Sequence, residues 1–583
     1  MEDSQLHIVH SWKTRFVEDN HEHCVSKLKE HETWKQVHFY SAPHSHHYSN
    51  GQLVRIQGMI QDMHNPEFYM SKYTVRNKVT GTRQMHSGKY KDVLQVESDE
   101  EIEFHDDREF SKERQSLFCI PIPALNEWVK DLHKQNLVLP ESKEGSDADR
   151  RGLKRSAEEN EDENMDVEDS AGKNKKQETE KAAGGGQATT TLESIQNFSF
   201  PIQDCEGHSF ILKVYDSEDS IKLNSMVEVV GFLSTDPALT CLDGGEMDND
   251  RNAEHPPPSL VPRLHVLGIN ILEHCNPLLP SFNFKTEAQK AFELANDVLL
   301  DLRIIFTPLL FGDKLAVDFF ICFLLSKVFA RKDVTNVGNL SVNFHELPNL
   351  TDYTTRFYQI LEKIVTKSHY FPLTIEGLNS KPFTPKKDYT SNKLRSGLLQ
   401  MSQGTLLVFD ETKLNVGQLQ DLGTRNVLAL RGLLERQEVL YDFQYYNTPF
   451  HTDLPILIFS EKKSLFPCDA RIPLECDPEA LKVINSSFEA ANLYLKKEEV
   501  LTRIRTFLTA AQLADYEIAD EAQTKIQEHF VEMRQKDKNF TGDDLHMILN
   551  LARLVTLSSG QHVLTVEIWK QACDMEGARR ARL

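Results

Sequence analysis

Residues Gly397 to Glu411 read GLLQMSQGTLLVFDE, and the second half of this stretch decides the fold of the C-terminal part of the chain. Thr405 to Phe409 (TLLVF) is a continuous apolar run, and Pro455 to Phe459 (PILIF) is another. Strands that are apolar at every position are typical of a parallel sheet with both faces covered. Helical apolar spacing surrounds these runs, for example over Leu315 to Ala330, and Leu373 to Ile375 is short and β-like. The sequence therefore predicts an α/β domain over residues 276–480 and a helical lid over 481–583.

The run TLLVF ends on two carboxylates, Asp410 and Glu411. An apolar strand that delivers two acids at its carboxyl end has the layout of a Walker B element, in which one acid holds magnesium and the other orients water. Acidic pairs also begin ordinary loops after buried strands. The pair by itself is therefore a weak indication of catalysis.

A nucleotide site also needs a glycine-rich loop whose backbone N–H groups reach the phosphates. The chain has no glycine between Gly338 and Gly377, where that loop would follow the first strand of the sheet, and no G-K-[ST] motif. Side chains along this loop would keep a phosphate away from the backbone. The sequence therefore predicts that Asp410 and Glu411 are vestigial, that the chain has no catalytic residue and that it holds no cofactor.

The N-terminal half carries short β runs separated by turn residues. Gly58 and Gly231 lie inside two of these runs, where a strongly coiled strand needs a residue without a side chain. The pattern predicts a small OB-like barrel, with two half-formed β units as the alternative. The runs are Leu53 to Ile60, Phe68 to Val75, Leu117 to Ile122, Phe210 to Tyr215, Val227 to Leu233 and Leu264 to Ile271.

Residues 141–190 separate the two groups of β runs. Apolar residues nearly vanish there, while short acidic and basic clusters alternate. Such a segment cannot offset the entropy of ordering, so the sequence predicts a disordered linker. The β domain is then split into residues 51–140 and 191–275, after an N-terminal helical segment over 1–50. The basic clusters are compatible with a nuclear import signal and equally with simple solvation.

Composition and charge limit the functions further. The 583 residues include 88 acidic and 66 basic ones, and the net charge of −22 disfavours an autonomous DNA clamp. Nine scattered cysteines without a CxxC pair indicate neither a disulfide framework nor a four-cysteine zinc site. The start has no signal-peptide pattern, and the most apolar stretch, Leu315 to Ala330, is shorter than the roughly 20 residues of a membrane span. We expect an intracellular, soluble protein with no metal and no membrane partner.

The segment GLLQMSQGTLLVFDE matches in spacing G-A-L-x-L-A-D-x-G-x-x-x-I-D-E of the minichromosome maintenance helicase subunits. Leu434 to Val439 (LERQEV) resembles their M-E-Q-Q-T-[VI], and Phe530 to Arg534 (FVEMR) resembles part of their lid. Over nearly its whole length the chain resembles the minichromosome maintenance (MCM) complex-binding protein family. The residues that carry this resemblance are RIQGMIQDMHNPEFYM (Arg55 to Met70), FCIPIP (Phe118 to Pro123), SLVPRLHVL with NPLLP (Ser259 to Pro280), KDYTSNKLRSGLLQ (Lys387 to Gln400) and DDLHMILNLAR (Asp543 to Arg553).

The resemblance implies an α+β multidomain protein with a split OB-like β domain and a degenerate AAA+-like α/β domain that ends in a helical lid. It implies a nuclear, non-catalytic binding protein of the replicative helicase. Such a protein would act in helicase assembly or remodelling and in unloading from chromatin during DNA replication, and would support sister chromatid cohesion and cell division. Its partners would be the helicase subunits, and its association with chromatin would be indirect.

Three other groups of residues have two interpretations each. His21, His23, Cys24, His44, His46 and His47 are metal ligands by type, but they lack a second ligand pair at finger spacing, which favours exposed histidines. Phe68 and Tyr69 suit either stacking on single-stranded bases or packing against protein. A helical apolar stripe suits either core packing of the lid or a docking surface; it consists of Leu545, Ile548, Leu549, Ala552 and Val555.

Two rival functions remain open from the sequence. One is an OB-fold protein that binds single-stranded nucleic acid through residues 1–275, although no dense basic groove is evident. The other is an atypical ATPase with an unusual phosphate site, for which Glu411 would orient the attacking water.

Overall fold

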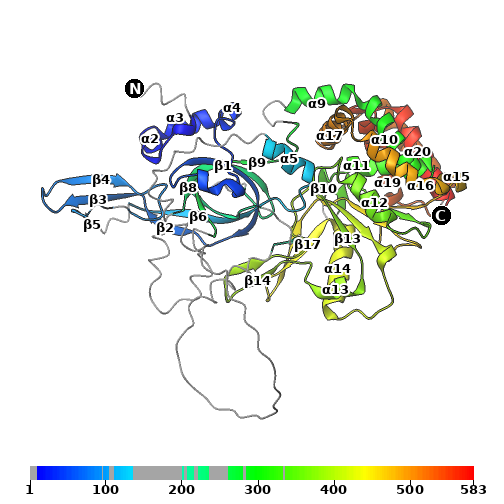
Figure 1. The fold of residues 1–583 in the computed structure, drawn as a ribbon. Helices are drawn as coiled ribbons and strands as arrows, with labels where there is room; N and C mark the ends of the chain where they lie inside the picture. Colours follow the sequence, from blue (N-terminus) through cyan, green and yellow to red (C-terminus); the bar gives the residue numbers. More distant parts are fainter. Residues whose placement is uncertain are drawn as a thin grey trace, which may run out of the picture.

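The chain folds into a β-barrel followed by a parallel α/β sheet with a thick helical layer (Figure 1). This mixed architecture with several sheets is consistent with the predicted α+β multidomain class. The computed structural model describes residues 9–94, 96, 98–103, 110–135, 200–202, 207–215, 221–235, 260–279, 284–332, 335–536 and 538–583. The predicted linker, with its basic clusters, lies outside the described residues.

Five strands close the barrel in the order β1-β8-β9-β7-β6, and β6 pairs back to β1. The β7·β9 pair is parallel and the other four pairs are antiparallel. Two strands therefore come from before residue 136 and three from after residue 206. Their bounds are β1 Leu53–Met63, β6 Ser111–Ile120, β7 Phe210–Val214, β8 Met226–Ser234 and β9 Arg263–Ile271.

At Gly58 and Gly231 the neighbouring barrel strand leaves no room for a side chain. A Cβ at Gly58 would stand 2.5 Å from Cys119 Sγ and 2.6 Å from the Ile120 carbonyl oxygen. A Cβ at Gly231 would stand 2.5 Å from the His265 carbonyl oxygen, and the register of the β8·β9 pair shifts at this point. The predicted need for glycine in coiled strands is therefore confirmed at both positions.

The N-terminal helices cover the outside of the barrel. Trp12 and Trp34 pack with Val230 and Phe232, which face outward from β8. All nine residues of β8 are buried as a result, because one face lines the barrel interior and the other lies under these helices. The covering elements are η1 Val9–Ser11, α2 Thr14–Asp19, α3 His21–Leu28 and α4 His31–Trp34, followed by η2 Ala42–His47.

A three-stranded arm projects from the barrel on the side away from the α/β sheet (Figure 1). It begins after β2 (Glu67–Met70), a short strand that pairs with the first half of β6. The single predicted run from Phe68 to Val75 is thus two strands, separated by Ser71. The arm consists of β3 Lys72–Asn77, β4 Arg83–Ser87 and β5 Glu100–Glu103.

The second sheet is wholly parallel, with the order β13-β16-β19-β12-β20. In β16, Leu406 and Val408 face one hydrophobic core, whereas Leu407 and Phe409 face another. The continuous apolar runs arise because both faces are covered, as predicted. The strands are β12 Val342–His345, β13 Ser368–Pro372, β16 Leu406–Asp410, β19 Ile456–Phe459 and β20 Ala470–Pro473.

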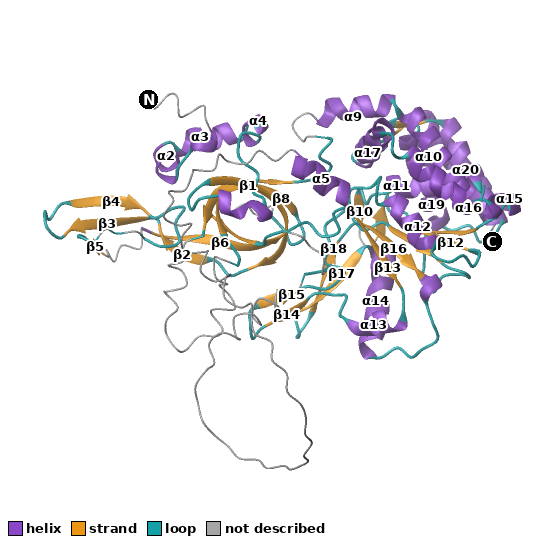
Figure 2. Ribbon diagram, in the orientation of Figure 1, coloured by secondary structure: helices purple, strands orange, loops and turns teal. Residues whose placement is uncertain are grey.

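Figure 2 shows the helical layer on one side of this sheet and α13 and α14 on the other. One continuous core joins the helices before the sheet with those after it. The layer contains α9 Phe284–Glu293, α10 Ala295–Leu309, α11 Lys314–Leu325, α12 Tyr353–Leu361, α15 Pro478–Lys482, α16 Ile484–Tyr494, α17 Glu498–Gln512, α18 Asp520–Lys536, α19 Gly542–Ser558 and α20 Val566–Ala581, and the opposite face carries α13 Ile375–Ser380 and α14 Asp421–Arg436.

Short elements complete the structure. Four strands form a small sheet between the barrel and α14, and the pair β10–β11 lies at the amino edge of the parallel sheet. No helix of the described ranges is long and apolar enough to cross a membrane. These elements are β10 Ala330–Lys332, β11 Thr335–Val337, β14 Lys386–Asp388, β15 Lys393–Arg395, β17 Glu438–Asp442, β18 Asn447–His451, β21 Glu517–Ile518, β22 Val563–Leu564, α5 Glu127–Gln135 and η6 Glu411–Lys413.

Two expectations about individual elements are wrong. The helix predicted to reach Ala330 ends at Leu325, because Ser326 takes an extended conformation. The β-like stretch predicted from Leu373 onward is the start of a helix. There the Thr374 side chain caps α13 by accepting a hydrogen bond from Gly377 N.

Candidate functional site

Asp410 ends β16 at the carboxyl edge of the parallel sheet, and its side chain is fully buried. One carboxylate oxygen accepts hydrogen bonds from the hydroxyls of Thr354 (2.7 Å) and Tyr370. The other accepts from the backbone N–H and the hydroxyl of Thr412, at 3.0 and 2.6 Å. Both oxygens are thus held by four protein donors, so a metal ion would have to displace them.

The loop between β12 and α12 occupies the position of a phosphate loop, but it packs into the protein. Leu347 is buried, and the buried Tyr353 at the start of α12 donates its hydroxyl to the Leu309 carbonyl oxygen at 2.7 Å. Glu346 and Asp352 take positive φ angles of 61° and 57° without being glycines. The loop therefore turns at two residues that carry side chains in a conformation that favours glycine. It offers no glycine backbone to a phosphate.

Glu411 follows Asp410 and points to a different loop. Its carboxylate accepts a hydrogen bond from the Ser464 hydroxyl at 2.7 Å, and burial raises its pKa. Ser460, at the end of β19, accepts a hydrogen bond from the Asn343 side-chain amide at 2.8 Å. The structure thus brings the two predicted acids to the expected edge, and each is occupied by hydrogen bonds from its own neighbours.

The histidine and cysteine candidates lie at the N-terminal helices. Cys24 is buried among apolar side chains in α3, whereas His23 on the same helix is exposed. His44 and His46 are exposed in η2. In the part of the chain that the structure describes, no group of three or more potential ligands is placed to hold a metal ion.

The two aromatic residues of β2 differ in environment: one is exposed to solvent and the other packs against protein. Phe68 is 73% exposed, but Tyr69 packs edge-to-face on Tyr215, and the Arg114 guanidinium lies 5.8 Å from the Tyr69 ring centroid. The apolar stripe on α19 belongs to the core between the helices, which confirms the core-packing interpretation.

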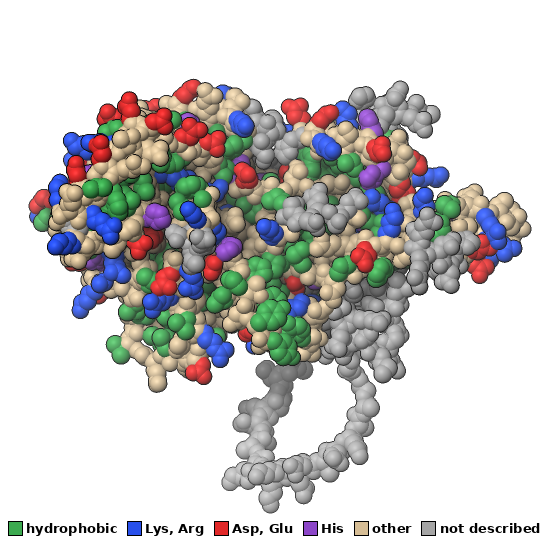
Figure 3. Space-filling view, turned by 180° about the vertical axis from the view of Figure 1, so that it is seen from behind, with side chains coloured by type: hydrophobic (Ala, Val, Ile, Leu, Met, Phe, Trp, Pro, Cys, Tyr) green, Lys and Arg blue, Asp and Glu red, His purple; other side chains and the backbone are tan. Residues whose placement is uncertain are grey.

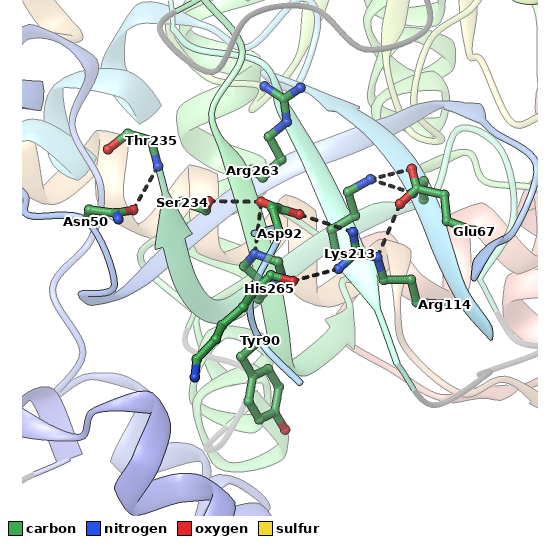
Figure 4. Close-up of polar contacts among 12 residues, drawn as sticks. Asn50, Glu67, Tyr90, Asp92, Arg114, Lys213, Ser234, Thr235, Arg263 and His265 are labelled. Carbon is green, nitrogen blue, oxygen red and sulfur yellow. Dashed lines mark hydrogen bonds and ion pairs between the residues drawn. The ribbon is translucent and has the colours of Figure 1, made fainter. Parts of the chain in front are cut away.

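A buried cluster of charges on the barrel wall was missed by the sequence analysis (Figure 4). Arg114 on β6 forms ion pairs with Glu67 (3.2 Å) and Asp92 (3.1 Å). Lys213 on β7 pairs with Glu67, and His265 on β9 lies 3.1 Å from Asp92. The signal available in the sequence was Lys213 itself, a charged residue inside the apolar strand FILKV.

This barrel charge cluster (Glu67, Asp92, Arg114, Lys213 and His265) is internally neutralised. Burial on its own would raise the pKa of Asp92, but His265, Arg114 and Lys213 hold it well below its usual range. The Asp92 carboxylate also accepts a hydrogen bond from the Ser234 hydroxyl at 2.9 Å. Every charged member has a partner of opposite sign, so the cluster fixes the loop before β5 on the outer face of the barrel.

Direct contacts tie the barrel to the α/β sheet. Asp62 of β1 accepts a hydrogen bond from Leu394 N at 2.8 Å, and Gln61 donates to the Leu394 carbonyl oxygen at 2.8 Å. On the other side of the junction, Asn126 and Trp128 both donate to the Val365 carbonyl oxygen at 2.8 Å. The two parts are therefore joined through hydrogen bonds to backbone groups, which are buried at Leu394 and partly buried at Val365.

Known proteins match the chain across both parts. A family model described as "Mini-chromosome maintenance replisome factor" matches residues 24–583. The chain is similar to proteins named "Mini-chromosome maintenance complex-binding protein". The Drosophila melanogaster protein is 34% identical over 575 residues, covering 95% of this chain and 94% of the relative. The Gallus gallus protein is 35% identical over 592 residues (96% and 92%), and the Homo sapiens protein is 34% identical over 616 residues (98% and 94%).

Proposed function

Because the chain belongs to the family of mini-chromosome maintenance complex-binding proteins, as its resemblance predicted, we propose that it binds the MCM helicase complex without a catalytic site of its own. One observation carries the second half of this proposal. The acid that would hold magnesium, Asp410, is fully buried, and its oxygens accept hydrogen bonds from Thr354, Tyr370 and Thr412.

We also propose a fold type for each of the two parts of the chain. The barrel order β1-β8-β9-β7-β6, with one parallel pair, supports an OB-type barrel whose second and third strands are β6 and β7. The parallel sheet places the end of β16 and the β12–α12 loop at one edge, separated by β19. This arrangement supports a degenerate AAA+-like domain. The strand end with the acidic pair and the loop that would bind phosphate keep their positions, but their residues no longer suit a nucleotide.

A helicase-like domain without a nucleotide site suggests how binding acts on the helicase. The domain would take a subunit-like position beside helicase subunits and contribute no ATP site there. Ring closure would then fail at that position, which gives a physical route to remodelling and to unloading from chromatin. On this proposal the protein works in the nucleus during DNA replication, supports sister chromatid cohesion and cell division, and reaches chromatin through the helicase.

The barrel surface argues against the rival single-strand-binding function. In OB-type barrels the outer face of the second and third strands receives oligonucleotides. Here Lys213 and Ser116 on that face are engaged with each other and with Glu67. Phe118 and Ile211 pack against Val261. On the face seen in Figure 3, acidic and basic side chains are interspersed rather than gathered into a basic band.

The proposal is tested by mixing the purified full chain with purified MCM helicase at mild salt and following both by size-exclusion chromatography. We expect the two to co-elute with and without ATP. A Glu411→Gln variant should bind equally well, since this carboxylate has no catalytic task. Failure to co-elute would refute binding, whereas ATP turnover by the isolated chain that is lost in Glu411→Gln would restore the ATPase alternative.

A further inference from the structure

The loop end of the small sheet (β14, β15, β17 and β18) carries an exposed group of aromatic side chains. Tyr389 lies in the turn after β14, and Phe443, Tyr445 and Tyr446 lie in the turn between β17 and β18. The three tyrosines are 46%, 84% and 59% exposed, in this order. In Figure 3 hydrophobic side chains gather at the lower edge of the molecule, where these two turns lie. We call these four residues the tyrosine patch.

The rings of the tyrosine patch hold one another in place. The Phe443 and Tyr446 rings are stacked with their centroids 5.3 Å apart, and the Tyr389 and Tyr445 centroids lie 5.8 Å apart. The Tyr389 hydroxyl donates a hydrogen bond to the Phe443 carbonyl oxygen at 3.2 Å, which ties the two turns together. Side chains that are already ordered lose less conformational entropy when a partner binds. The patch is therefore preorganised for binding.

The small sheet that carries the patch is itself fixed to the barrel. Tyr441 of β17 is fully buried, and its hydroxyl accepts a hydrogen bond from the Asn224 side-chain amide at 2.6 Å. On β15, the backbone of Leu394 is bonded to the side chains of Asp62 and Gln61 of β1. The two turns thus project from a sheet that is held at the junction of the barrel and the α/β part, and they are not on a free loop.

The exposed aromatic area is large for a soluble chain. Together the three tyrosines expose roughly 300–450 Å², since a whole aromatic side chain offers about 150–250 Å². Leu440 of β17 is 43% exposed and pairs with Pro449 of β18, which adds apolar surface along the same hairpin. Apolar patches of a few hundred Å² mark interaction sites on soluble proteins. The tyrosine patch is therefore a candidate docking surface.

The surroundings of the patch are basic, although the chain as a whole is acidic. Residues 381–395 and 438–451, which contain the two turns, carry five Lys and Arg but only three Asp and Glu, whereas the net charge of the chain is −22. Two of these cations form exposed ion pairs, Lys386 with Asp442 (3.6 Å) and Arg395 with Asp388 (2.6 Å). Exposed pairs contribute little to stability, so an acidic partner can compete for them. The charge of this rim is complementary to an acidic surface.

The geometry of the rings favours a protein partner over single-stranded nucleic acid. Successive bases stack on separate, accessible ring faces. Here Phe443 and Tyr446 cover one face of each other, and the Tyr389 and Tyr445 rings are inclined by 52°. A second copy of the chain is disfavoured as well, because two identical basic rims would face each other.

We propose that the tyrosine patch is the centre of the surface through which the chain contacts a subunit of the MCM helicase. This inference rests on the proposed function, and it adds the place of contact and the chemistry of the partner surface. That surface is apolar at its centre, where it receives the tyrosine rings, and acidic at its rim. Tyrosine suits the centre of such an interface because its large ring packs against apolar groups while its hydroxyl forms hydrogen bonds.

The experiment titrates the full chain with purified MCM helicase and compares the native chain with a Tyr445→Ala/Tyr446→Ala variant. We expect this variant to bind about tenfold more weakly or worse, because truncated anchor residues dominate the loss of binding at an interface. Its melting temperature should equal that of the native chain, since both side chains are mostly exposed. Phe68→Ala is the matched control. Phe68 is a 73% exposed aromatic residue of β2 on the barrel, and its loss should leave helicase binding unchanged.

A second variant tests the charge of the rim. Lys386→Glu combined with Arg395→Glu should weaken helicase binding, and the loss should be larger at low salt than at high salt because screening reduces it. Lys482→Glu is the control, since Lys482 is also exposed and also forms an ion pair, with Glu479, but lies in the helical layer. This control should bind like the native chain. The charge variant also decides the matter if the double tyrosine variant does not fold.

The possible outcomes separate this inference from the proposed function. If the native chain does not bind the helicase, the proposed function fails and the inference fails with it. If the native chain binds and the folded tyrosine and charge variants bind equally well, only the inference is overturned. Binding of an oligothymidylate by the native chain that is lost in the tyrosine variant would assign the patch to nucleic acid instead. A dimer of the native chain that is lost in the same variant would assign it to a second copy. Either result overturns the proposal.

Discussion

The barrel charge cluster and the amino edge of the sheet bury arginine in opposite ways. Arg114 on the barrel lies between Glu67 and Asp92, and it also donates to the Lys91 carbonyl oxygen at 3.1 Å. Arg553 on α19 is buried as well, and the Phe329 ring lies 4.4 Å from its guanidinium carbon. Asp453 and Tyr516 interact with it electrostatically, but among the described residues its Nε and Nη1 atoms have no hydrogen-bond partner. The first guanidinium is held by direct ion pairs, whereas the second has a ring contact and electrostatic interactions but no direct ion pair within the described residues. The contrast separates a buried charge that is directly paired from one that is not.

The most direct test of this comparison is to make the same substitution at both arginines. Arg114→Met leaves Glu67 and Asp92 buried with fewer cations, so we expect the free energy of unfolding to fall by about 3–5 kcal/mol. Arg553→Met removes a charge that has no direct ion pair among the described residues, so we expect a change below about 1 kcal/mol. Urea unfolding at pH 7 measures both. Equal losses at the two positions would show that Arg553 stabilises the fold as strongly as Arg114 does without a direct ion pair.

Acid titration probes the pairing in the barrel from the carboxylate side. Burial on its own would raise the pKa of Glu67, but Lys213 and Arg114 lower it from 4.5 to about 2. The folded-state pKa lies below the unfolded value, so this stabilisation is present above about pH 4.5 and is lost as the pH falls toward 2.

We expect Glu67→Gln to lower the free energy of unfolding by roughly 2–3 kcal/mol at pH 7, with the difference from the native chain shrinking as the pH falls below about 4.5. Urea midpoints between pH 7 and pH 2.5 measure this convergence. Glu479→Gln, which removes an exposed carboxylate, serves as the control for charge loss alone. A constant difference across this pH range would mean that Glu67 is not held ionised by its neighbours.

Local pattern was sufficient to predict the sheet but not the charge clusters. TLLVF and PILIF were predicted as buried strands because every residue of such a strand meets one of two cores. Asp92 and His265 are 173 positions apart in the chain, and only closure of the barrel brings them together. A pairing of this kind leaves no periodic signal, so it could not be read from spacing.

The burial of Arg553 in the helical layer was not predicted for the same reason: it depends on contacts between distant segments of the chain. The stripe containing Ile548 and Ala552 has helical spacing, and its burial was predicted as one of two interpretations. Arg553 follows directly in the sequence, where a charged side chain is typical of a solvent-facing position. The Phe329 ring beside its guanidinium lies over two hundred residues earlier in the chain, so this contact leaves no local signal in the sequence. The acids at the sheet edge were located by pattern, but their hydrogen bonds were not.

The comparison of buried charges also applies to Asp410, a buried acid at the carboxyl edge of the parallel sheet. Asp410 resembles Asp92 in having a donor for each oxygen, so it should also act as a structural residue. Asp410→Asn places an amide group against hydroxyl and N–H donors, and we expect it to lower the free energy of unfolding by roughly 1–2 kcal/mol. Urea unfolding measures this loss, and helicase binding by the folded variant should be unchanged. An unchanged stability would indicate that the hydrogen bonds to Thr354 and Thr412 are dispensable.

Among the substitutions compared, we expect the change at Glu411 to have the smallest effect on the free energy of unfolding. Its carboxylate is only partly buried, burial raises its pKa, and its main partner is the Ser464 hydroxyl. In Glu411→Gln the amide oxygen still accepts that hydrogen bond, so we expect the free energy of unfolding to change by less than about 0.5 kcal/mol. Asp410→Asn, one residue earlier, is the matched comparison in the same urea titration. A large loss at Glu411 would mean that the partly buried acid, rather than the fully buried one, holds this edge together. Counting the direct partners of a charge would then fail to predict its contribution to stability at the sheet.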